Sequence, residues 1–190
     1  MNALPPKDPF APLTEEERQT AASRPDDGEI WEPISPPPSE PAMPPSALAM
    51  WVYRDAEGRP LCARFRVDRP GGGKDILPLT YGHRVWTDGK GVRRDETGWH
   101  WKQGRRPLPL YGLDRLAERP DAPVLLVEGE KTAEAVGRLF PDYVGMTSPG
   151  GSNAARNADW SPLAGRAGTL GPATDDRGGS YTLLLHTSPS

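Results

Sequence analysis

The residues best placed to do chemistry follow a short aliphatic run in the second half of the chain. Residues 124–127 read Val-Leu-Leu-Val, and Glu128, Gly129 and Glu130 come directly after them. An unbroken aliphatic run of this length is typical of a strand buried on both faces of a parallel sheet. Open α/β sheets bind ligands beyond the carboxyl ends of such strands, so Glu128 is a candidate catalytic residue. Gly129 lets the backbone turn sharply, and the start of the following helix favours anions such as phosphates.

A purely structural role is the alternative for these acidic residues. Glu128 and Glu130 stand at the expected start of a helix, where carboxylates interact favourably with the helix dipole. Because single acid–glycine turns are common, the residues alone leave both roles open.

The helix that must position Glu128 is predicted over residues 131–140. Its pattern places Ala135, Val136 and Leu139 on one face, and Pro141 ends it. We expect this face to pack on the sheet.

Further strands complete the expected α/β pattern. Residues 143–147 and 168–170 predict two strands, and a glycine-containing loop occupies residues 148–152. A short helix is predicted over residues 112–118, before the first strand. We therefore expect an α/β domain over residues 111–190.

Three segments, taken in order, resemble the Toprim domain of primase-like DNA replication proteins of phages and mobile elements. They are Leu126–Ala135, Thr147–Gly151 and Ala158–Arg166. The resemblance implies a Rossmann-like parallel sheet and Mg²⁺-dependent nucleotidyl transfer. In that family, an acidic residue matching Glu128 acts as general acid or base and joins the metal site. Single-stranded DNA and nucleotides are the implied partners, and a replicative helicase is a further candidate.

The chain departs from this family at a second motif, Asp-x-Asp, which holds Mg²⁺. Ala173 stands at the first aspartate position and Asp175 at the second, so the implied metal ligands are Glu128 and Asp175. Asp176 does not replace the missing aspartate, because adjacent residues in extended chain point in opposite directions. We expect a Toprim domain that is incomplete at its C-terminus, with weak or no nucleotidyl transferase activity.

A small antiparallel sheet is predicted before this domain, over residues 47–110. Along the second arm of its first hairpin, residues 61–67, the side chains of Arg64 and Arg66 face one way and Phe65 faces the other. The alternation predicts one basic face and one core face.

This region has the charge of a nucleic-acid-binding surface. Between residues 54 and 106, thirteen Lys or Arg residues outnumber seven Asp or Glu residues, and tryptophans lie among them. Arg64, Arg66 and Lys131 are the candidate contacts to nucleic acid. A non-catalytic single-stranded nucleic-acid-binding or scaffold protein is therefore the alternative function.

The first 46 residues are predicted to be a disordered tail. Twelve of the 24 prolines lie before Ser46, and residues 1–45 carry three basic and nine acidic side chains. Such a segment buries too little apolar surface to offset the entropy of ordering.

Cys62 is the only cysteine, which excludes a disulfide framework and a structural zinc cluster. No apolar run approaches the ~20 residues that a membrane span needs. We expect a cytoplasmic protein with no membrane partner.

Overall fold

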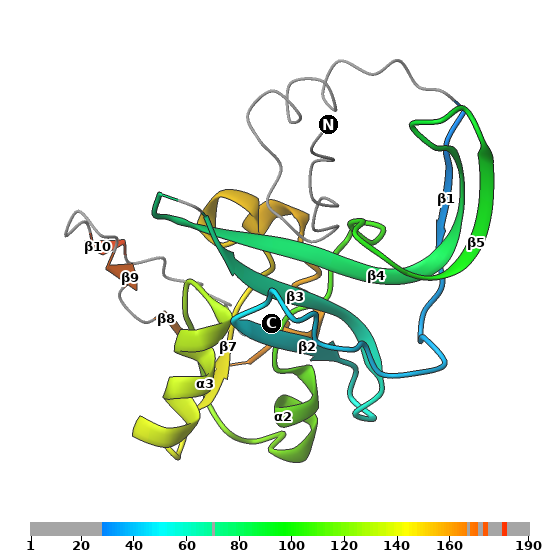
Figure 1. Ribbon diagram of the computed structural model, residues 1–190. Coiled ribbons are helices and arrows are strands. Elements are labelled where there is room, and N and C mark those ends of the chain that lie inside the picture. Colours follow the sequence, from blue (N-terminus) through cyan, green and yellow to red (C-terminus); the bar gives the residue numbers. More distant parts are fainter. Residues whose placement is uncertain (1–27, 70, 167, 171–172, 175–179, 182–190) are drawn as a thin grey trace.

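The protein combines a curled antiparallel sheet with a small parallel sheet, so its class is mixed α/β (Figure 1). The computed structural model describes residues 28–69, 71–166, 168–170, 173–174 and 180–181. Within these residues, no helix has both the length and the apolar character needed to cross a membrane.

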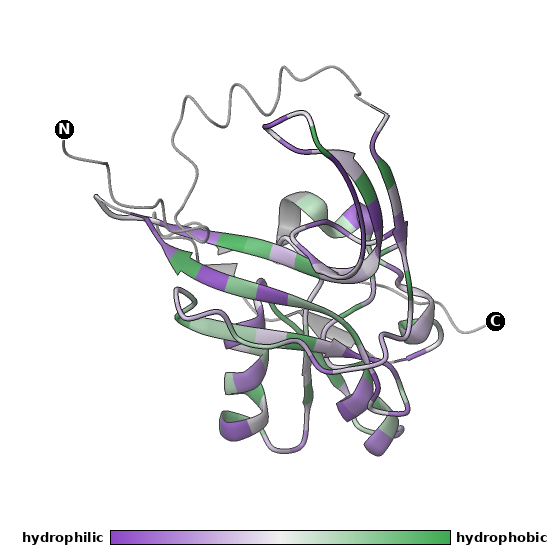
Figure 2. Cartoon of the chain, turned by 45° about the vertical axis from the view of Figure 1, so that its right-hand side comes forward, coloured by the Kyte–Doolittle hydropathy of each residue, from purple (hydrophilic) through white to green (hydrophobic). Residues whose placement is uncertain are grey.

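The antiparallel sheet has five strands in the order β1-β4-β3-β2, and β5 also pairs with β4. The strands are β1 (Ile30–Pro33), β2 (Ala49–Arg54), β3 (Pro60–Asp68), β4 (Lys74–Thr87) and β5 (Arg93–His100). The predicted hairpin is confirmed as β2 and β3. In its turn, Asp55 Oδ1 accepts hydrogen bonds from the backbone N–H groups of Glu57 at 3.1 Å and Arg59 at 2.8 Å. Hydrophilic and hydrophobic residues alternate along residues 64–68 of β3, and Figure 2 colours the chain by this property.

The 14-residue strand β4 belongs to both halves of the curled sheet. Residues 74–79 pair with β3, whereas residues 80–87 pair with β5 and residues 82–85 pair with β1. Gly82 permits the close approach of β1, because a Cβ atom there would lie 2.5 Å from the carbonyl oxygen of Glu32. Figure 1 shows β1 and β5 beside the curled end of β4.

The prediction of a disordered N-terminal tail is wrong for the segment that forms β1, residues 30–33. Glu29, just before this strand, accepts hydrogen bonds from Arg84 at 2.6 Å and from Lys102 at 2.6 Å. Local composition does not reveal these partners, because the nearer of them lies 55 positions away in the chain. Residues 1–27 lie outside the described residues.

Both faces of the antiparallel sheet are covered, so the predicted division into a basic face and a core face is wrong. One face packs around Phe65. The opposite face packs Trp51 and Tyr53 against Tyr111, which belongs to the α/β part of the chain. Arg64 pairs across the strands with Trp51 and is 6% exposed. Strand alternation separates the two faces, but it does not show that the second face meets another part of the chain.

The parallel sheet has the strand order β7-β6-β8. Its strands are β6 (Val124–Leu126), β7 (Val144–Met146) and β8 (Gly168–Leu170), which confirms the three strands predicted from the sequence. The core beneath this sheet contains Leu110, Leu116 and Leu163 together with the buried residues of β6 and β7.

Short helices precede and connect these strands. They are α2 (Leu113–Glu118), α3 (Glu130–Leu139) and the 3₁₀ helices η1 (Ser152–Asn157) and η2 (Ser161–Leu163). After β8, the two short strands β9 (Ala173–Thr174) and β10 (Ser180–Tyr181) pair antiparallel.

Helix α3 is present where predicted, but its buried face differs from the expected one. The buried residues are Glu130, Ala133 and Val136, whereas Leu139 is 70% exposed. Gly145 of β7 explains the orientation, because a Cβ atom there would lie 2.3 Å from the carbonyl oxygen of Ala133. The helix therefore rests directly on the strand backbone.

Candidate functional site

Glu128 lies beyond the carboxyl end of β6, the middle strand of the parallel sheet. Its side chain is exposed, and the chain continues through Gly129 into α3. The N–H of Val127 donates to the carbonyl of Met146 at 2.9 Å. The hydrogen bonding with β7 therefore extends to the residue just before Glu128. The central strand therefore presents a carboxylate to solvent at the sheet edge where open α/β sheets bind ligands.

The loop after β7 lies against Glu128. Gly150 and Gly151 have φ values of 85° and 67°, in the region that favours glycine. Gly151 also has a ψ of −165°, and this combination is essentially confined to glycine. A Cβ atom at Gly151 would lie 3.9 Å from Cγ of Glu128. The loop backbone thus approaches the carboxylate without a side chain between them.

Gly129 does not have the role expected from the sequence. Its φ of −149° and ψ of 165° are extended values that any residue adopts. The glycine-dependent turn lies instead at Gly150 and Gly151. The start of α3 has no side-chain cap, so the described contacts do not show Glu128 or Glu130 capping the helix.

Glu130 makes a buried contact that the sequence analysis missed. Its Oε1 atom accepts a hydrogen bond of 2.7 Å from the hydroxyl of Tyr53, a residue of β2. Glu130 is 8% exposed and Tyr53 is fully buried. Burial and the neighbouring carboxylate raise the pKa of Tyr53 well above its ordinary value. The pair joins the antiparallel sheet to the start of α3, two residues after Glu128.

A signal for this contact exists in the sequence. Glu130, Ala133 and Val136 share one helical face at a spacing of three residues, a pattern that places Glu130 on the buried side. A second tyrosine also bonds to α3: the hydroxyl of Tyr111 donates a hydrogen bond to Glu134 at 3.1 Å.

The predicted nucleic-acid contacts have different surroundings. Lys131 is exposed at the start of α3, and Arg66 is half-buried with its Nε atom 3.2 Å from Oδ1 of Asp68. Arg64 lies buried, where its guanidinium donates to Oε1 of Gln103 at 2.9 Å. Within the described residues, no hydrogen bond or ion pair joins these arginines to the Glu128 carboxylate. Their role in nucleic-acid binding stays a prediction.

Much of the positive charge counted in the sheet region is paired locally. Ion pairs join Arg54 to Glu40, Arg59 to Asp55, Arg69 to Asp75, Arg84 to Glu29 and Arg94 to Asp88. Such pairs reduce the field that a phosphate backbone meets, so the excess of basic residues overstates the open positive surface.

The tryptophans of the sheet serve mainly as packing groups. Trp99 packs with the cluster around Phe65 and makes an edge-to-face contact with Tyr81 at a centroid distance of 5.6 Å. Trp101 is 41% exposed and contacts the Phe65 ring at 5.4 Å. Trp99 is therefore a packing residue of the antiparallel sheet.

No group of three or more metal-ligating side chains occurs within the part of the chain that the structure describes. Asp175, the second predicted ligand, lies outside it. The Mg²⁺ site implied by the resemblance therefore stays a prediction.

Comparisons with protein-family models, curated proteins and solved structures find no match for this chain. The three Toprim-like segments and the surroundings of Glu128 are therefore the basis for any functional proposal.

Proposed function

We propose that the chain is a primase-like Toprim protein that acts in DNA replication of a phage or mobile element. The observation that carries this proposal is the position of Glu128, exposed beyond the middle strand of a sheet ordered β7-β6-β8. In doubly wound sheets, ligands bind where the strand order reverses, beside the first strand. Glu128 stands at the corresponding point of this sheet.

In this proposal, Glu128 is the general acid or base of nucleotidyl transfer. An exposed carboxylate is able to take the proton of the attacking hydroxyl group. Gly151 keeps a side chain away from the space beside it, which suits the close approach of a nucleotide phosphate.

Replacing Glu128 by glutamine tests this role, because the substitution preserves shape and removes charge. Because the chain itself is expected to have weak or no activity, the substitution is also made in Ala173→Asp. In that variant we expect incorporation of nucleotides on a single-stranded template to fall by about 10²-fold or more, the usual contribution of general acid–base catalysis. The matched control is Glu118→Gln, an exposed carboxylate at the end of α2, and it leaves incorporation unchanged. Measurable incorporation that is equal with and without Glu128→Gln would contradict the role of Glu128.

Mg²⁺ enters the proposal only as a cation shared by Glu128 and Asp175, and no chemical step depends on it here. Calorimetric titration of Mg²⁺ compares the chain with Ala173→Asp. We expect weak binding by the chain and tighter binding by the variant, since residues two apart in extended chain point to the same side. Tight binding by the unaltered chain would show that the missing aspartate is not needed.

A non-catalytic single-stranded nucleic-acid-binding protein is the second candidate, favoured because the described residues contain no cluster of metal ligands. Its test is fluorescence anisotropy with labelled single strands over a range of salt concentrations. Lys131→Glu and Arg66→Glu should each weaken binding and reduce the salt dependence, since log K falls by about 0.7 per phosphate contact and decade of salt. Arg138→Glu, on the last turn of α3, is the control. Unchanged binding in both variants would exclude Lys131 and Arg66 as contacts to nucleic acid.

A further inference from the structure

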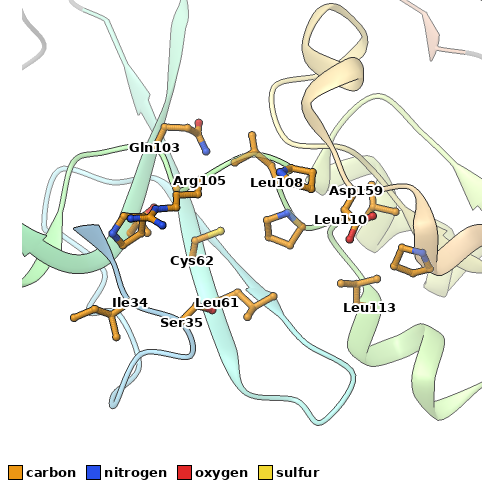
Figure 3. A pocket seen from close by; sticks show the side chains of 16 residues that line it. Ile34, Ser35, Leu61, Cys62, Gln103, Arg105, Leu108, Leu110, Leu113 and Asp159 are labelled. Atoms are coloured by element: carbon orange, nitrogen blue, oxygen red, sulfur yellow. The ribbon is translucent and has the colours of Figure 1, made fainter. Parts of the chain in front are cut away.

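Strand β1 is a short edge strand that leads into the wall of a cavity. Among the described strands it pairs with β4 alone, through the four residues Ile30–Pro33. The next two residues, Ile34 and Ser35, line a cavity of about 390 Å³ together with Leu61 and Leu108 (Figure 3). Elements with few partners open at a low cost in free energy. The wall of this cavity therefore depends on how firmly β1 is held.

The side chain of Trp31 anchors β1 to the rest of the sheet. Its indole Nε1 donates a hydrogen bond of 3.0 Å to the carbonyl of Gln103. Its ring lies against β4 at Gly82, where a Cβ atom would be 2.7 Å from the Cη2 atom of the ring. The ring also makes an edge-to-face contact with the imidazole of His100, at a centroid distance of 5.6 Å. The anchor of β1 thus rests partly on His100.

His100, the last residue of β5, is enclosed. It is 9% exposed, and the ring of Trp86 contacts it at a centroid distance of 5.9 Å, in addition to Trp31. Its Nε2 atom is buried and has no hydrogen-bond partner among the described residues. Protonation of the imidazole would place a full positive charge in this space, and burying a charge without a partner is costly.

The charged groups around His100 add to this cost. Arg84 of β4 and Lys102 are the neighbouring cations, and Glu96 of β5 is a neighbouring anion. Both cations donate hydrogen bonds to Glu29, the residue before β1. Burial lowers the pKa of His100 below its ordinary value of 6.5, and the charge of Arg84 lowers it further. The hydrogen bond to the backbone of Glu96 and the charge of its carboxylate oppose this shift only in part.

We propose that residues 29–35 are an acid-released strap, which forms part of the cavity wall at neutral pH and moves away when His100 is protonated. A charged imidazole is less stable in the enclosure than in water, so a state in which Trp31 has moved away binds the proton more tightly. Protonation therefore shifts the population from the held strap to the released one. The strap is independent of Glu128 and of the function proposed for it.

The pH range of the release follows from the direction of the pKa shift. Well above pH 6.5, His100 is neutral in both states and the strap is fully held. As the pH falls below 6.5, the released state binds the proton first. The released fraction then rises by up to about tenfold for each pH unit, until the pH reaches the lowered pKa of the held state.

Glu29 acts in a separate and more acidic range. Burial alone would raise the pKa of its carboxyl group, but hydrogen bonds from Lys102 and Arg84 bring that pKa below the ordinary value of 4.5. The contribution of Glu29 to holding the strap is therefore present above pH 4.5 and is lost only at lower pH.

Hydrogen exchange of the full chain, followed by mass spectrometry between about pH 7.5 and 5.5, tests the release. Protection factors already correct for the intrinsic effect of pH on exchange. We expect the protection factors of β1 and Ile34 to fall by up to about tenfold between pH 6.5 and 5.5. Those of the β2 and β3 hairpin should stay constant. Constant protection of β1, or an equal fall in the hairpin, would overturn the proposal.

A variant identifies the group that titrates. His100→Gln removes the titrating group and keeps a polar side chain, so the protection of β1 should no longer depend on pH in this range. His83→Gln is the matched control, because His83 lies on the opposite face of β4 and pairs with Asp95 at 2.8 Å. It should keep the pH dependence of the unaltered chain. A pH dependence that survives in His100→Gln would exclude His100 as the trigger.

Nuclear magnetic resonance titration of the His100 imidazole gives a second readout in the unaltered chain, which does not rely on folding of the variant. The apparent pKa of His100 should lie below its ordinary value of 6.5. An apparent pKa at or above 6.5 would mean that the held state accepts the proton without penalty, and the proposal would fail.

Discussion

At the residue scale, the hydrogen bond between Tyr53 and Glu130 is the contact with the largest expected effect. Its donor and acceptor are both buried, and the acceptor is a carboxylate. Removing the donor leaves this carboxylate without its hydroxyl partner. We expect Tyr53→Phe to lower the free energy of unfolding by about 1–3 kcal/mol, measured by urea denaturation.

The control for this prediction is Tyr81→Phe. Tyr81 is half-buried on β4, and its hydroxyl makes no hydrogen bond in the part of the chain that is described. Losing the Tyr81 hydroxyl should change the free energy of unfolding little. If Tyr53→Phe lowered the free energy of unfolding as little as Tyr81→Phe does, the Glu130 carboxylate would have found another partner in the variant.

At the scale of elements, the packing of α3 on β7 depends on Gly145. A Cβ atom there meets the helix backbone at 2.3 Å, a contact that only movement of the helix relieves. We expect Gly145→Ala to destabilise the protein by about 1–3 kcal/mol, as overpacking commonly does. Thermal unfolding monitored by circular dichroism measures the change.

Gly137 gives the opposite expectation within the same helix. It is exposed, and a Cβ atom there has no neighbour within 4 Å. Gly137→Ala should stabilise the protein by about 0.5–1 kcal/mol, because alanine favours the helix. If both substitutions changed the stability in the same direction, the close contact between α3 and β7 would not explain the effect of Gly145→Ala.

At the scale of the whole molecule, the junction between the two sheets should weaken in alkali. Burial raises the pKa of Cys62 to about 12 and that of Tyr111 to about 12. In the unfolded chain these groups lose their protons at lower pH, near their ordinary values of 9.0 and 10.0. The stabilisation is therefore complete below pH 9 and is lost as the pH rises toward 12.

Urea denaturation at a series of pH values measures this loss. Tyr111→Phe should give a shallower decline above the ordinary pKa of tyrosine, since one titrating group is removed from the junction. Tyr81→Phe should follow the wild-type slope. A decline that is equally steep in Tyr111→Phe would exclude Tyr111 as a source of the alkaline sensitivity.

The elements that depend on local pattern were determined by the sequence itself. The Val-Leu-Leu-Val run predicts β6, and the turn at Asp55 predicts the hairpin of β2 and β3, because each pattern specifies its own backbone conformation. The position of Glu128 after β6 follows from the same local rule. It remains the centre of the proposed site.

Tertiary structure decided which faces are buried and which distant segments pair. Arg64 is buried because the second sheet face meets the α/β part, and Glu29 is held by Arg84 from a distant position. Leu139 is exposed and Glu130 buried because Gly145 sets how α3 rests on β7. Each outcome depends on contacts between segments far apart in the chain. The spacing of Glu130, Ala133 and Val136 marks a buried helix face, but neither composition nor periodicity specifies which segment covers it.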